Sequence, residues 1–402
     1  MDHVHQVAIV GGGLVGASLA IALDRAGIDA ALVEATPDGA MPAVFDQRNL
    51  SFAEASVNAL TALGVLQKLA TPPGPIRRIH VSRAGDFGRV CLDAQDYDRA
   101  QFGQVVVARD FGLALDARLA EARHVARYRP ARLTTLARDE AGRPLLHLEG
   151  ADGPQRIAAA LVVAADGSDS QTRAALGIDA AVHDYRQALF VARLRTARPP
   201  DGVAYERLTA SGPTALLPRG DRHYGLVHGV DADDAGAVAA LDDAAFLARV
   251  QDTFGWRAGR FVDVGPRSRY ALRRVVASRL TAPRAALVGN AAQTLHPVGA
   301  QGFNLGLRDA LTLAELVTGQ PDPGAPGLLE AYAARRREDR AATLGFSDGL
   351  ARLTSNPSLL LRPLRSLGLL VLERDAGLRA ALASGAMGYR GQVPALCRAG
   401  GA

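Results

Sequence analysis

The stretch Gln6-Val-Ala-Ile-Val-Gly-Gly-Gly-Leu-Val-Gly16 decides the fold of this chain. Its first five residues are a short, mostly apolar run, which is typical of a strand buried in a parallel sheet. The run leads directly into the pattern GxGxxG at Gly11, Gly13 and Gly16, then into a predicted helix and a second short strand at residues 30–34. We therefore predict that the chain opens with a βαβ unit.

The three glycines have separate physical roles in a unit that holds a pyrophosphate. Gly11 permits the tight turn after the strand, Gly13 lets phosphates approach the backbone, and Gly16 lets the helix pack closely on the sheet. At the helix start, Leu14 and Val15 offer free N–H groups together with the positive end of the helix dipole. The motif predicts a dinucleotide site, and a purely structural glycine turn is the alternative.

A carboxylate, Glu34, ends the second strand 23 residues after Gly11. At that position a carboxylate accepts a hydrogen bond from a ribose 2′-hydroxyl and repels a 2′-phosphate. The sequence therefore favours a dinucleotide whose adenosine ribose carries no phosphate.

Length and composition bound the other possibilities. The chain has 402 residues, with 46 Lys or Arg against 41 Asp or Glu, and this size predicts two or three domains or one large fold with an inserted layer. Lys68 is the only lysine, which excludes a Walker-type phosphate loop. Cys91 and Cys397 are too few for a disulfide framework or a CxxC zinc site, and they fit a reducing cytoplasm.

Charge and hydropathy favour a protein without a signal peptide or a membrane span. The N-terminus enters the first strand directly, and no apolar run reaches about 18–20 residues. The best candidate, residues 359–372, is interrupted by two arginines and a proline; we expect it to pack on the body of the protein, with membrane or partner contact as the alternative. The run Arg335-Arg336-Arg337 is followed by Glu338 and Asp339, which predicts a solvated helix face rather than a nucleic-acid patch.

The pattern along the chain predicts an α/β fold with an inserted layer. Residues 1–175 and 284–320 form a discontinuous Rossmann-like βαβ domain, residues 176–283 a mostly antiparallel β-sheet layer for substrate, and residues 321–402 a helical C-terminal region. The individual elements expected are helices at residues 49–69, 109–123 and from 304 onward, a hairpin at 132–148, a strand at 161–165, and helix breaks at Pro321–Pro326 and Pro357.

The densest signal is Gly289-Asn-Ala-Ala-Gln-Thr-Leu-His-Pro-Val-Gly-Ala-Gln-Gly-Phe-Asn-Leu-Gly-Leu-Arg-Asp309. A predicted strand ends at its start, a loop rich in proline and glycine follows, and a helix begins near Gly302. The amide of Asn290 can both donate to and accept from a polyol hydroxyl. The backbone at Gly302, Phe303 and Asn304 can hold an oxygen that becomes anionic.

Asp166-Gly167 is a weaker signal, because the chain holds five Asp-Gly pairs and most such pairs are plain turns. Only this pair follows a strand of the buried type.

These three segments resemble the FAD-dependent aromatic hydroxylases of the p-hydroxybenzoate hydroxylase type. The third motif is most similar to the ubiquinone-biosynthesis branch, which hydroxylates 2-polyprenyl-6-methoxyphenol (the UbiH type). The resemblance runs from about Val7 to Met387. It implies a flavoprotein monooxygenase that uses NAD(P)H and O2 to hydroxylate a prenylated phenol. The few cysteines and the absence of a signal peptide favour a cytoplasmic location, with peripheral membrane contact or association with other ubiquinone-biosynthesis proteins left open.

The resemblance also implies a cofactor role for each matching residue, and it names no catalytic residue and no metal. In that assignment Gly11, Gly13, Leu14, Val15, Gly16 and Glu34 hold the ADP half of FAD; Arg48, Gln104 and Arg109 line the path of the pyrophosphate and ribityl chain; Asp166 and Gly167 lie near the pyrophosphate and the visiting nicotinamide nucleotide; Gly289 and Asn290 meet the ribityl chain; and Pro297, Gly302, Phe303 and Asn304 lie along the isoalloxazine ring.

Two positions depart from the family pattern. The broad family has Gly-Asp where this chain has Gly289-Asn290, an amide that the ubiquinone branch tolerates. Many relatives have Gly-Gln-Gly at residues 300–302, so the loop backbone at Ala300 must accept a Cβ. In the same loop, His296 is expected to be a satisfied structural histidine.

Other functions leave parts of the sequence unexplained. A tryptophan-type flavin halogenase needs two tryptophans and a working lysine, whereas Trp256 and Lys68 each stand alone, and a plain NAD dehydrogenase does not account for the third motif. The GxSxG match at residues 345–349 lacks a preceding strand, and His223 and His228 are predicted on opposite faces of a strand, so neither a hydrolase nor a metal site is expected. A hydroxylase of another small aromatic compound and a non-enzymatic binding module on the same fold remain alternatives.

Overall fold

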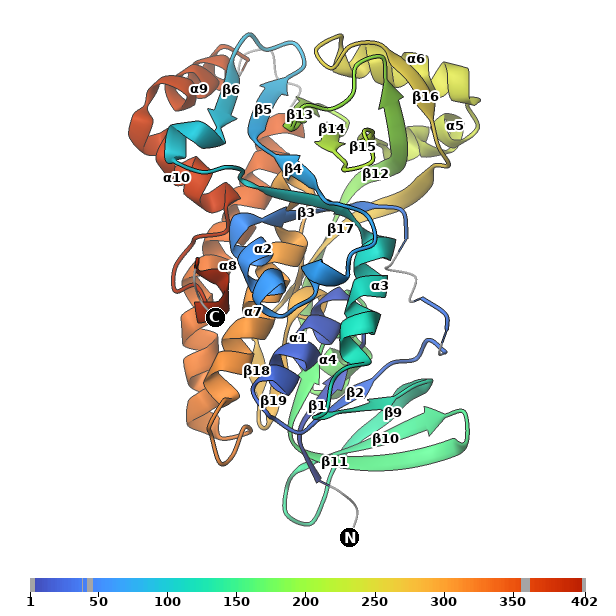
Figure 1. Cartoon of the computed structure of the whole chain (residues 1–402), viewed down its shortest axis with the longest axis vertical. Helices are drawn as coiled ribbons and strands as arrows, with labels where there is room; N and C mark the ends of the chain where they lie inside the picture. The colour runs from blue at the N-terminus through green and yellow to red at the C-terminus, as the bar shows by residue number, and fades with distance from the viewer. Residues whose placement is uncertain (1–3, 38, 42–45, 356–361, 400–402) are drawn as a thin grey trace.

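The computed structural model describes residues 4–37, 39–41, 46–355 and 362–399. Two large β-sheets lie one above the other along the long axis of the molecule (Figure 1). Helix α8 (Pro326–Ser355) contacts strands of both sheets and so connects the two halves. The candidate site lies where the two sheets approach each other.

The first sheet contains the predicted βαβ opening. Its strands follow the order β18-β19-β11-β1-β2-β8, and β1 pairs in parallel with both β11 and β2. These strands are β1 (Val4–Val10), β2 (Ala30–Val33), β8 (Val125–Tyr128), β11 (Gly153–Ala164), β18 (Thr281–Ala282) and β19 (Ala285–Leu287). Helix α1 (Leu14–Arg25) joins β1 to β2. The apolar runs of β1 and β11 are buried on both faces, which is why they lack the alternation of a half-exposed strand.

Strands β9 (Ala131–Arg138) and β10 (Pro144–Gly150) extend the first sheet and confirm the predicted hairpin. A short helix, α4 (Gln171–Ala175), follows β11 and the Asp166-Gly167 pair.

The second sheet is mostly antiparallel, as the alternating middle of the chain predicted. Its order is β20-β17-β12-β15-β14-β13-β5-β6, with β16 paired to β12. Its strands are β5 (Arg78–Arg83), β6 (Arg89–Asp93), β12 (Ala180–Thr196), β13 (Val203–Thr209), β14 (Gly212–Pro218), β15 (Tyr224–Asp231), β16 (Phe261–Val264), β17 (Ser268–Ala277) and β20 (Gln293–Thr294). Two of these strands, β5 and β6, come from the first hundred residues, so the layer draws on sequence outside residues 176–283.

One face of the second sheet packs under helices α5 (Ala235–Ala239) and α6 (Asp243–Phe254). Alternate β12 residues, among them Phe190 and Leu194, are buried in this cluster. The opposite face of the sheet turns toward the candidate site.

The segment after residue 48 is not the single helix that the sequence predicted. Strand β3 (Asn49–Ala53) pairs with β7 (Gly103–Val107), which also pairs with β4 (Gly74–Ile76), and only then does helix α2 (Glu54–Ala62) begin. Helix α3 (Ala108–Leu119), by contrast, lies within one residue of its predicted start.

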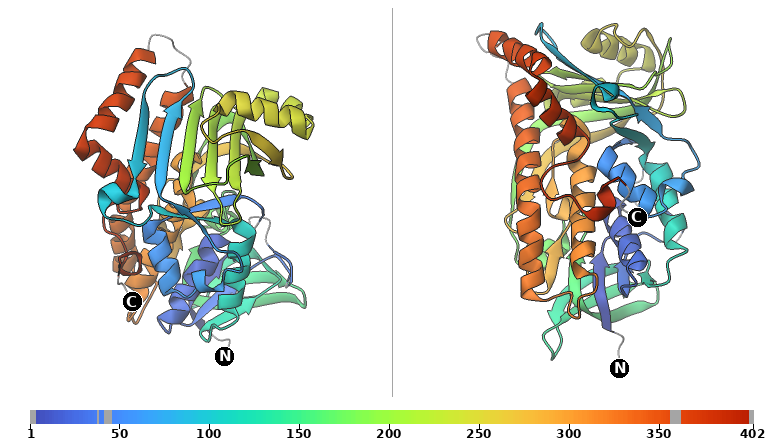
Figure 2. Two further views of the ribbon diagram at one scale, coloured as in Figure 1. Left: turned by 45° about the horizontal axis from the view of Figure 1, so that its top comes forward. Right: turned by 60° about the vertical axis from the view of Figure 1, so that its left-hand side comes forward.

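Four helices form the C-terminal part of the described chain: α7 (Gln301–Val317), α8, α9 (Arg362–Arg374) and α10 (Ala376–Ala386). Helices α7 and α8 pack side by side (Figure 2, right). The predicted break at Pro321–Pro326 is confirmed, and Pro326 opens α8, where a missing N–H costs nothing. The break predicted at Pro357 lies outside the described residues.

The arginine run of α8 is not the solvated face that its charge pattern predicted. Arg336 and Asp339 are fully buried, and Arg336 donates to Asp309 Oδ1 and to Asp339 Oδ2, each at 2.7 Å. Arg337 and Glu338 are exposed, as predicted. The prediction failed at Arg336 because its partner Asp309 lies on α7, 27 residues earlier in the chain.

Helix α9 divides residues 362–372, the described part of the segment at 359–372, between two environments. Arg365 and Ser366 are buried, whereas Leu364, Leu367 and Val371 are 64%, 53% and 55% exposed. The expectation that this segment packs on the body therefore holds for one face of α9 and fails for the other. In the described part of the chain, no helix is both long enough and apolar enough to cross a membrane.

Candidate functional site

A cavity of about 830 Å³ lies between the two sheets. The first glycine motif, the Asp166-Gly167 turn and the loop from Asn290 to Asn304 all line it, although they come from three distant parts of the sequence. Of the residues assigned to the cofactor, Gly11, Gly13, Leu14, Val15, Glu34, Arg48, Asp166, Gly167, Asn290, Pro297, Gly302, Phe303 and Asn304 line this cavity, whereas Gly16, Gln104, Arg109 and Gly289 do not.

The first glycines form a tight turn that leaves no room for side chains. Gly11 has a φ of +106°, and a Cβ there would lie 2.6 Å from the carbonyl oxygen of Ala165. A Cβ at Gly16 would lie 1.9 Å from the Gly11 carbonyl oxygen, so Gly16 acts in packing rather than by lining the cavity. Gly13 occupies the N-cap of α1, and the free N–H groups of the first helical turn therefore open toward the cavity.

Glu34 closes the same end of the cavity. Its Oε2 accepts a hydrogen bond from the Gly12 N–H at 2.8 Å, and its Oε1 accepts one from the Thr36 N–H at 2.7 Å. A carboxylate has about four acceptor positions, so two remain for hydroxyl groups of a ligand.

Arg48 is held in place by residues that the sequence reasoning did not identify. Its Nε and Nη2 donate to Asp46 at 2.9 and 2.8 Å, and its guanidinium stacks at 4.4 Å over the ring of Tyr270. Burial lowers the pKa of Arg48, but the ion pair with Asp46 outweighs that effect and raises it overall. The sequence held one clue to the role of Asp46, namely its position two residues before Arg48. No residue near Arg48 in the sequence indicated Tyr270, which lies on β17.

Gln104 and Arg109 do not line the cavity, contrary to the expectation that both follow the path of the pyrophosphate and ribityl chain. The Oε1 of Gln104 is buried and has no hydrogen-bond partner, so a donor is missing next to β7. The side chain of Arg109 is exposed at the start of α3, and its backbone N–H donates to the Asp46 carbonyl at 2.9 Å.

The Asp166 carboxylate is used within the protein to shape the turn after β11. It accepts hydrogen bonds from the Thr172 N–H and the Thr172 hydroxyl, both at 2.9 Å, and from the Ser170 hydroxyl. Gly167 follows with a φ of +90°, which favours glycine. The carboxylate is therefore engaged inside the protein, while Asp166 and Gly167 both line the cavity.

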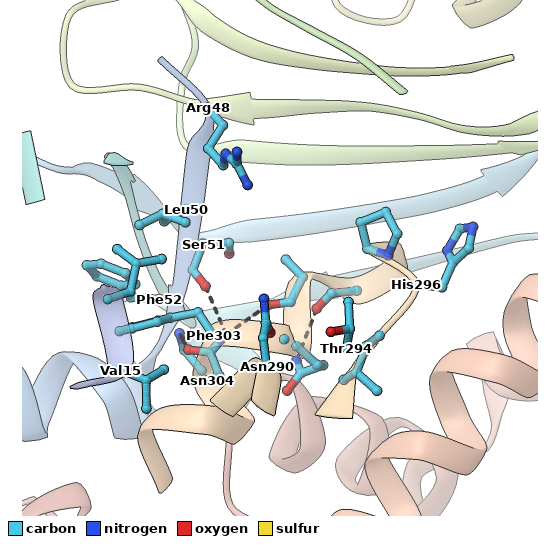
Figure 3. A pocket seen from close by; sticks show the side chains of 18 of the residues that line it. Val15, Arg48, Leu50, Ser51, Phe52, Asn290, Thr294, His296, Phe303 and Asn304 are labelled. Carbon is cyan, nitrogen blue, oxygen red and sulfur yellow. Dashed lines mark hydrogen bonds between the residues drawn. The ribbon is translucent and has the colours of Figure 1, made fainter. Parts of the chain in front are cut away.

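The third motif brings Asn290 to the cavity wall between Phe303 and Thr294 (Figure 3). Gly289, with a φ of +59°, lies against α1, since a Cβ there would be 3.0 Å from the side chain of Val15. Gly306 likewise leaves no room for a side chain, because a Cβ at that position would lie 2.8 Å from the Gly289 Cα. Close backbone packing of the strand end, α1 and α7 thus fixes the direction in which Asn290 points.

Ala300 adopts the left-handed conformation at the N-cap of α7, with φ 50° and ψ 37°. This geometry favours glycine, and Ala300 adopts it at a steric cost. The turn directs the N–H groups of Gly302 and Phe303 toward the cavity at a helix start, where they have no intrahelical acceptor.

The side chain of Asn304 is fully engaged inside the protein. Its Oδ1 accepts from the Ala53 N–H at 2.9 Å and the Ser56 hydroxyl at 2.7 Å. Its Nδ2 donates to the carbonyls of Ser51 and Ala300, both at 2.9 Å (Figure 3). This amide therefore joins β3 to the loop, and its remaining contribution to a ligand is through the backbone.

His296 also lines the cavity. Its Nε2 lies 3.2 Å from Gln187 Oε1, and its Nδ1 accepts from the Val298 N–H at 3.3 Å, which fits the expected satisfied histidine. Burial lowers its pKa to about 4. Ser347, the serine of the GxSxG match, lies in the middle of α8 and donates to the His296 carbonyl at 3.0 Å. It is therefore part of a helix rather than of a nucleophile elbow, as expected.

His223 and His228 have separate partners. His223 lies beside Asp221, whereas His228 is buried with its Nδ1 2.9 Å from the Thr214 hydroxyl. Among the described residues, no three His, Cys, Asp or Glu side chains converge in a way that would hold a metal ion.

The remainder of the cavity is mostly apolar and lies on the inner face of the second sheet. Its walls are Ile79, Val81 and Leu92 from β5 and β6, Ala204, Pro213, Ala215, Leu217 and Val227 from β13 to β15, Phe346 and Leu350 from α8, and Leu382 and Ala386 from α10. Such an arrangement accommodates a flat polar group beside the glycine motifs and an extended hydrocarbon beyond it.

Comparison with known proteins supports a single family. The model of the FAD-binding domain family matches residues 4–347. The chain is 36% identical to ubiquinone hydroxylase UbiL of Rhodospirillum rubrum over 96% of this chain and 90% of the relative. It is 30% identical to 3-demethoxyubiquinol 3-hydroxylase of Escherichia coli over 93% of this chain and 96% of the relative.

The fold has close counterparts among solved structures. The p-nitrophenol 4-monooxygenase PnpA of Pseudomonas putida superposes with a TM-score of 0.78 at 17% identity, over 98% of this chain and all of that chain. The probable FAD-dependent monooxygenase pqsL of Pseudomonas aeruginosa superposes with a TM-score of 0.76 at 20% identity, over 92% of this chain and all of that chain.

Proposed function

We propose that this chain, which belongs to the FAD-binding domain family, hydroxylates the aromatic ring of a polyprenylated phenol in ubiquinone biosynthesis. FAD is its cofactor, and the enzyme is a monooxygenase that uses NAD(P)H and O2 on an aromatic substrate. The length of the prenyl tail and the ring position are outside this proposal.

The residues around the cavity fit FAD. Next to the tight turn at Gly11 the backbone N–H groups of α1 are free for the pyrophosphate, and Glu34 retains acceptor positions for the ribose. Two buried acceptors, Gln104 Oε1 and Gln301 Oε1, lack donors inside the protein, and Gln301 lines the cavity. We assign the adenosine end to Glu34 and the isoalloxazine ring to the loop at residues 297–302, here called the flavin loop. Bound there, FAD supplies the electron transfer and the activation of O2.

The observation that carries the substrate assignment is the apolar extension of the same cavity. A small phenol needs only the part beside the flavin loop, whereas the walls contributed by β5, β6 and α10 continue beyond it. Each buried CH₂ group contributes about 0.8 kcal/mol, so one isoprenoid unit tightens binding by orders of magnitude. The names of the relatives, which are ubiquinone hydroxylases, agree with such a substrate.

We further propose that the enzyme works in the cytoplasm with α9 in peripheral contact with a membrane, because a polyprenylated phenol resides in lipid. The exposed Leu364, Leu367 and Val371 lie three and four residues apart and therefore share one face of α9. Phe87, which is 69% exposed, belongs to the adjacent β5–β6 turn, whose backbone approaches Ser366 of α9. Together these four residues form an apolar surface, here called the α9 patch.

Coupling of NAD(P)H oxidation to hydroxylation tests the substrate class. The hydroxylated product formed per NAD(P)H consumed is measured for a prenylated methoxyphenol and for p-hydroxybenzoate under the same conditions. We expect near-stoichiometric product from the prenylated phenol, and slow turnover or peroxide from the small acid. Equal or better coupling with p-hydroxybenzoate would refute the ubiquinone assignment and favour a hydroxylase of small aromatic acids.

A further inference from the structure

One carboxyl group interrupts the apolar face that the second sheet presents to the cavity. Glu206 lies on β13, with Val81 of β5 and Ala215 of β14 beside it in register. Apart from Glu206, the residues of strands β5, β6, β13, β14 and β15 that line the cavity are all apolar: Ile79, Val81, Leu92, Ala204, Pro213, Ala215, Leu217 and Val227.

Alternation along β13 explains how Glu206 reaches this face. Tyr205 and Arg207 point to the other side of the sheet, where Tyr205 packs on Phe254 and Arg207 donates to the Thr253 carbonyl of α6 at 3.2 Å. Glu206 therefore projects away from α6 and into the cavity.

The carboxyl group lies at the end of the cavity that holds the flavin loop. The carboxyl group lies near the backbone N–H of Gly299, and Gly299 directly precedes the left-handed Ala300 at the start of α7. In the described part of the chain, Glu206 forms no ion pair. Burial raises its pKa to about 7, although the nearby Gly299 N–H acts in the opposite direction.

Packing does not explain a carboxyl group at this position. A carboxylate that faces an apolar cavity without a cation is costly to ionise, and an apolar residue would complete the surface without that cost. Perturbed groups of this kind, placed in a substrate cavity, are typical of catalytic acids and bases. The other residues of the cavity include no better-placed base at this end, since both ring nitrogens of His296 already have partners.

Resting on the proposed function, we propose that Glu206 is the base that accepts the proton of the substrate's phenol hydroxyl while the ring is hydroxylated. The O–H bond of the phenol breaks, the proton moves to a carboxylate oxygen of Glu206, and the electron pair stays on the phenol oxygen. The added electron density makes the ring more nucleophilic toward the oxygen that it receives. The ring C–H bond at the hydroxylated carbon then breaks, its electron pair restores the aromatic ring, and its proton leaves to water. Glu206 returns its own proton to the phenol oxygen, so the residue is unchanged at the end of the cycle.

The surroundings of Glu206 allow the ionisation of its carboxyl group to be followed through the pH dependence of the activity. Strands β5 and β14 contribute Val81 and Ala215, and α8 contributes Phe346 and Leu350, so the neighbouring elements bring no charge to the cavity here. The other titratable groups near this end are His296 and Arg390, and the Arg390 guanidinium stacks over Phe346 at 5.1 Å. Neither residue forms an ion pair with Glu206, so a pH profile that changes with Glu206 is attributable to that residue.

The test compares the FAD-loaded wild-type enzyme with Glu206→Gln, Glu206→Asp and the control Arg207→Gln. Product per NAD(P)H and kcat for a prenylated methoxyphenol are measured from pH 5.5 to pH 9.5. Wild-type kcat should rise as pH increases through about 7. In Glu206→Gln we expect kcat to fall about 100-fold, with KM changed less than about threefold, and to recover only as pH approaches the pKa of the phenol near 10. Glu206→Asp should retain an intermediate activity, and Arg207→Gln should show the wild-type profile.

Thermal unfolding separates this role from a structural one. Because Glu206→Gln removes a charge from a mostly apolar cavity wall, its Tm at pH 8 should equal or exceed that of the wild type, with full FAD content. A lower Tm or lost FAD would assign Glu206 to the fold and overturn the proposal, as would wild-type kcat and pH profile in Glu206→Gln. A wild-type enzyme that hydroxylates no prenylated phenol would instead refute the proposed function.

Discussion

Arg308 of α7 donates from Nε to Oδ2 of Asp339 on α8 at 2.7 Å, and neither side chain is exposed to solvent. Arg336 extends the contact by binding both Asp339 and Asp309. Gln293, on the short strand β20, donates to the second oxygen of Asp309 at 2.5 Å. This network therefore ties the helix that begins at the flavin loop to the helix that spans both sheets.

Removing one carboxylate from this network should destabilise the protein strongly. Asp339→Asn leaves Arg308 and Arg336 buried without full charge compensation, and we expect a loss of about 3–5 kcal/mol in the free energy of unfolding. Urea denaturation followed by circular dichroism measures it. The control is Asp233→Asn, which removes an ion pair with Arg186 whose side chains are 83% and 75% exposed, and it should change the stability very little. Equal effects of the two changes would contradict the importance assigned to the buried network.

Ala300→Gly should stabilise the protein. The left-handed conformation destabilises a residue with a Cβ by about 1–2 kcal/mol, and glycine removes that cost. The greater freedom of glycine in the unfolded chain offsets about 0.5–1 kcal/mol of this stabilisation. The net expectation is a gain of about 0.5–1 kcal/mol in the same urea experiment. Gly299→Ala is the matched change in the opposite direction, because Gly299 has a φ of +73° in the same turn. An unstable Ala300→Gly enzyme would mean that the Cβ contributes packing that outweighs the strain.

The elements that were predictable from sequence are those whose signals are local. The GxGxxG turn, the β9–β10 hairpin and the start of α7 each depend on residues that are near one another in the sequence; the hairpin strands pair across a short turn. Strand β3 was missed because its partner β7 begins 50 residues after Ala53, and nothing within Asn49–Ala53 announces that pairing.

The candidate base shows a different limit of sequence reasoning. Along β13 the residues Tyr205, Glu206 and Arg207 are all polar or amphipathic, so the pattern does not say which face is buried. Only the pairing of β13 between β5 and β14 shows that Glu206 shares its face with apolar residues. Likewise Arg336 was indistinguishable from Arg335 and Arg337 until its helix was placed against α7.

Glu34→Ala should weaken the binding of FAD without unfolding the chain. The substitution removes the acceptor positions assigned to the ribose, along with the bonds that order the N–H groups of Gly12 and Thr36. Lost hydrogen bonds of this kind cost about 1–3 kcal/mol, which is roughly a tenfold to hundredfold increase in Kd. Fluorescence titration of the apoprotein with FAD gives the value, and circular dichroism checks the fold. Glu34→Gln keeps one acceptor oxygen, so its affinity for FAD should lie between those of the wild type and Glu34→Ala. An unchanged affinity in Glu34→Ala would mean that Glu34 only shapes the turn.

The α9 patch should carry the contact with lipid. Replacing Leu364, Leu367 and Val371 together by Ser removes most of its exposed apolar surface, and partitioning onto lipid vesicles should fall at least tenfold. Co-sedimentation with vesicles of phosphatidylethanolamine and phosphatidylglycerol provides the measurement. Leu113→Ser is the control, because Leu113 is 51% exposed on α3, in a different part of the molecule. Vesicle binding that survives the triple change would place the membrane contact elsewhere.

Two buried histidines should make the protein less stable in mild acid. Burial lowers the pKa of His228 to about 4, with a smaller contribution from the charge of Arg249, and burial lowers the pKa of His296 to about 4 as well. In the unfolded chain each histidine titrates near 6.5, so the unfolded state takes up protons first. The stability that these residues contribute is therefore complete above about pH 6.5 and is lost progressively as the pH falls toward 4.

His228→Phe isolates one of these contributions. Between pH 7.5 and pH 5.0 each histidine should lower the free energy of unfolding by about 2 kcal/mol, given pKa values of about 4 in the folded state and 6.5 in the unfolded state. The variant loses the contact with the Thr214 hydroxyl at every pH, so its absolute stability is not the quantity of interest. The informative quantity is the difference between the two pH values, which should be smaller in His228→Phe than in the wild type by about 2 kcal/mol. If urea denaturation gives the same difference for both proteins, His228 accepts its proton in the folded state as readily as in the unfolded chain.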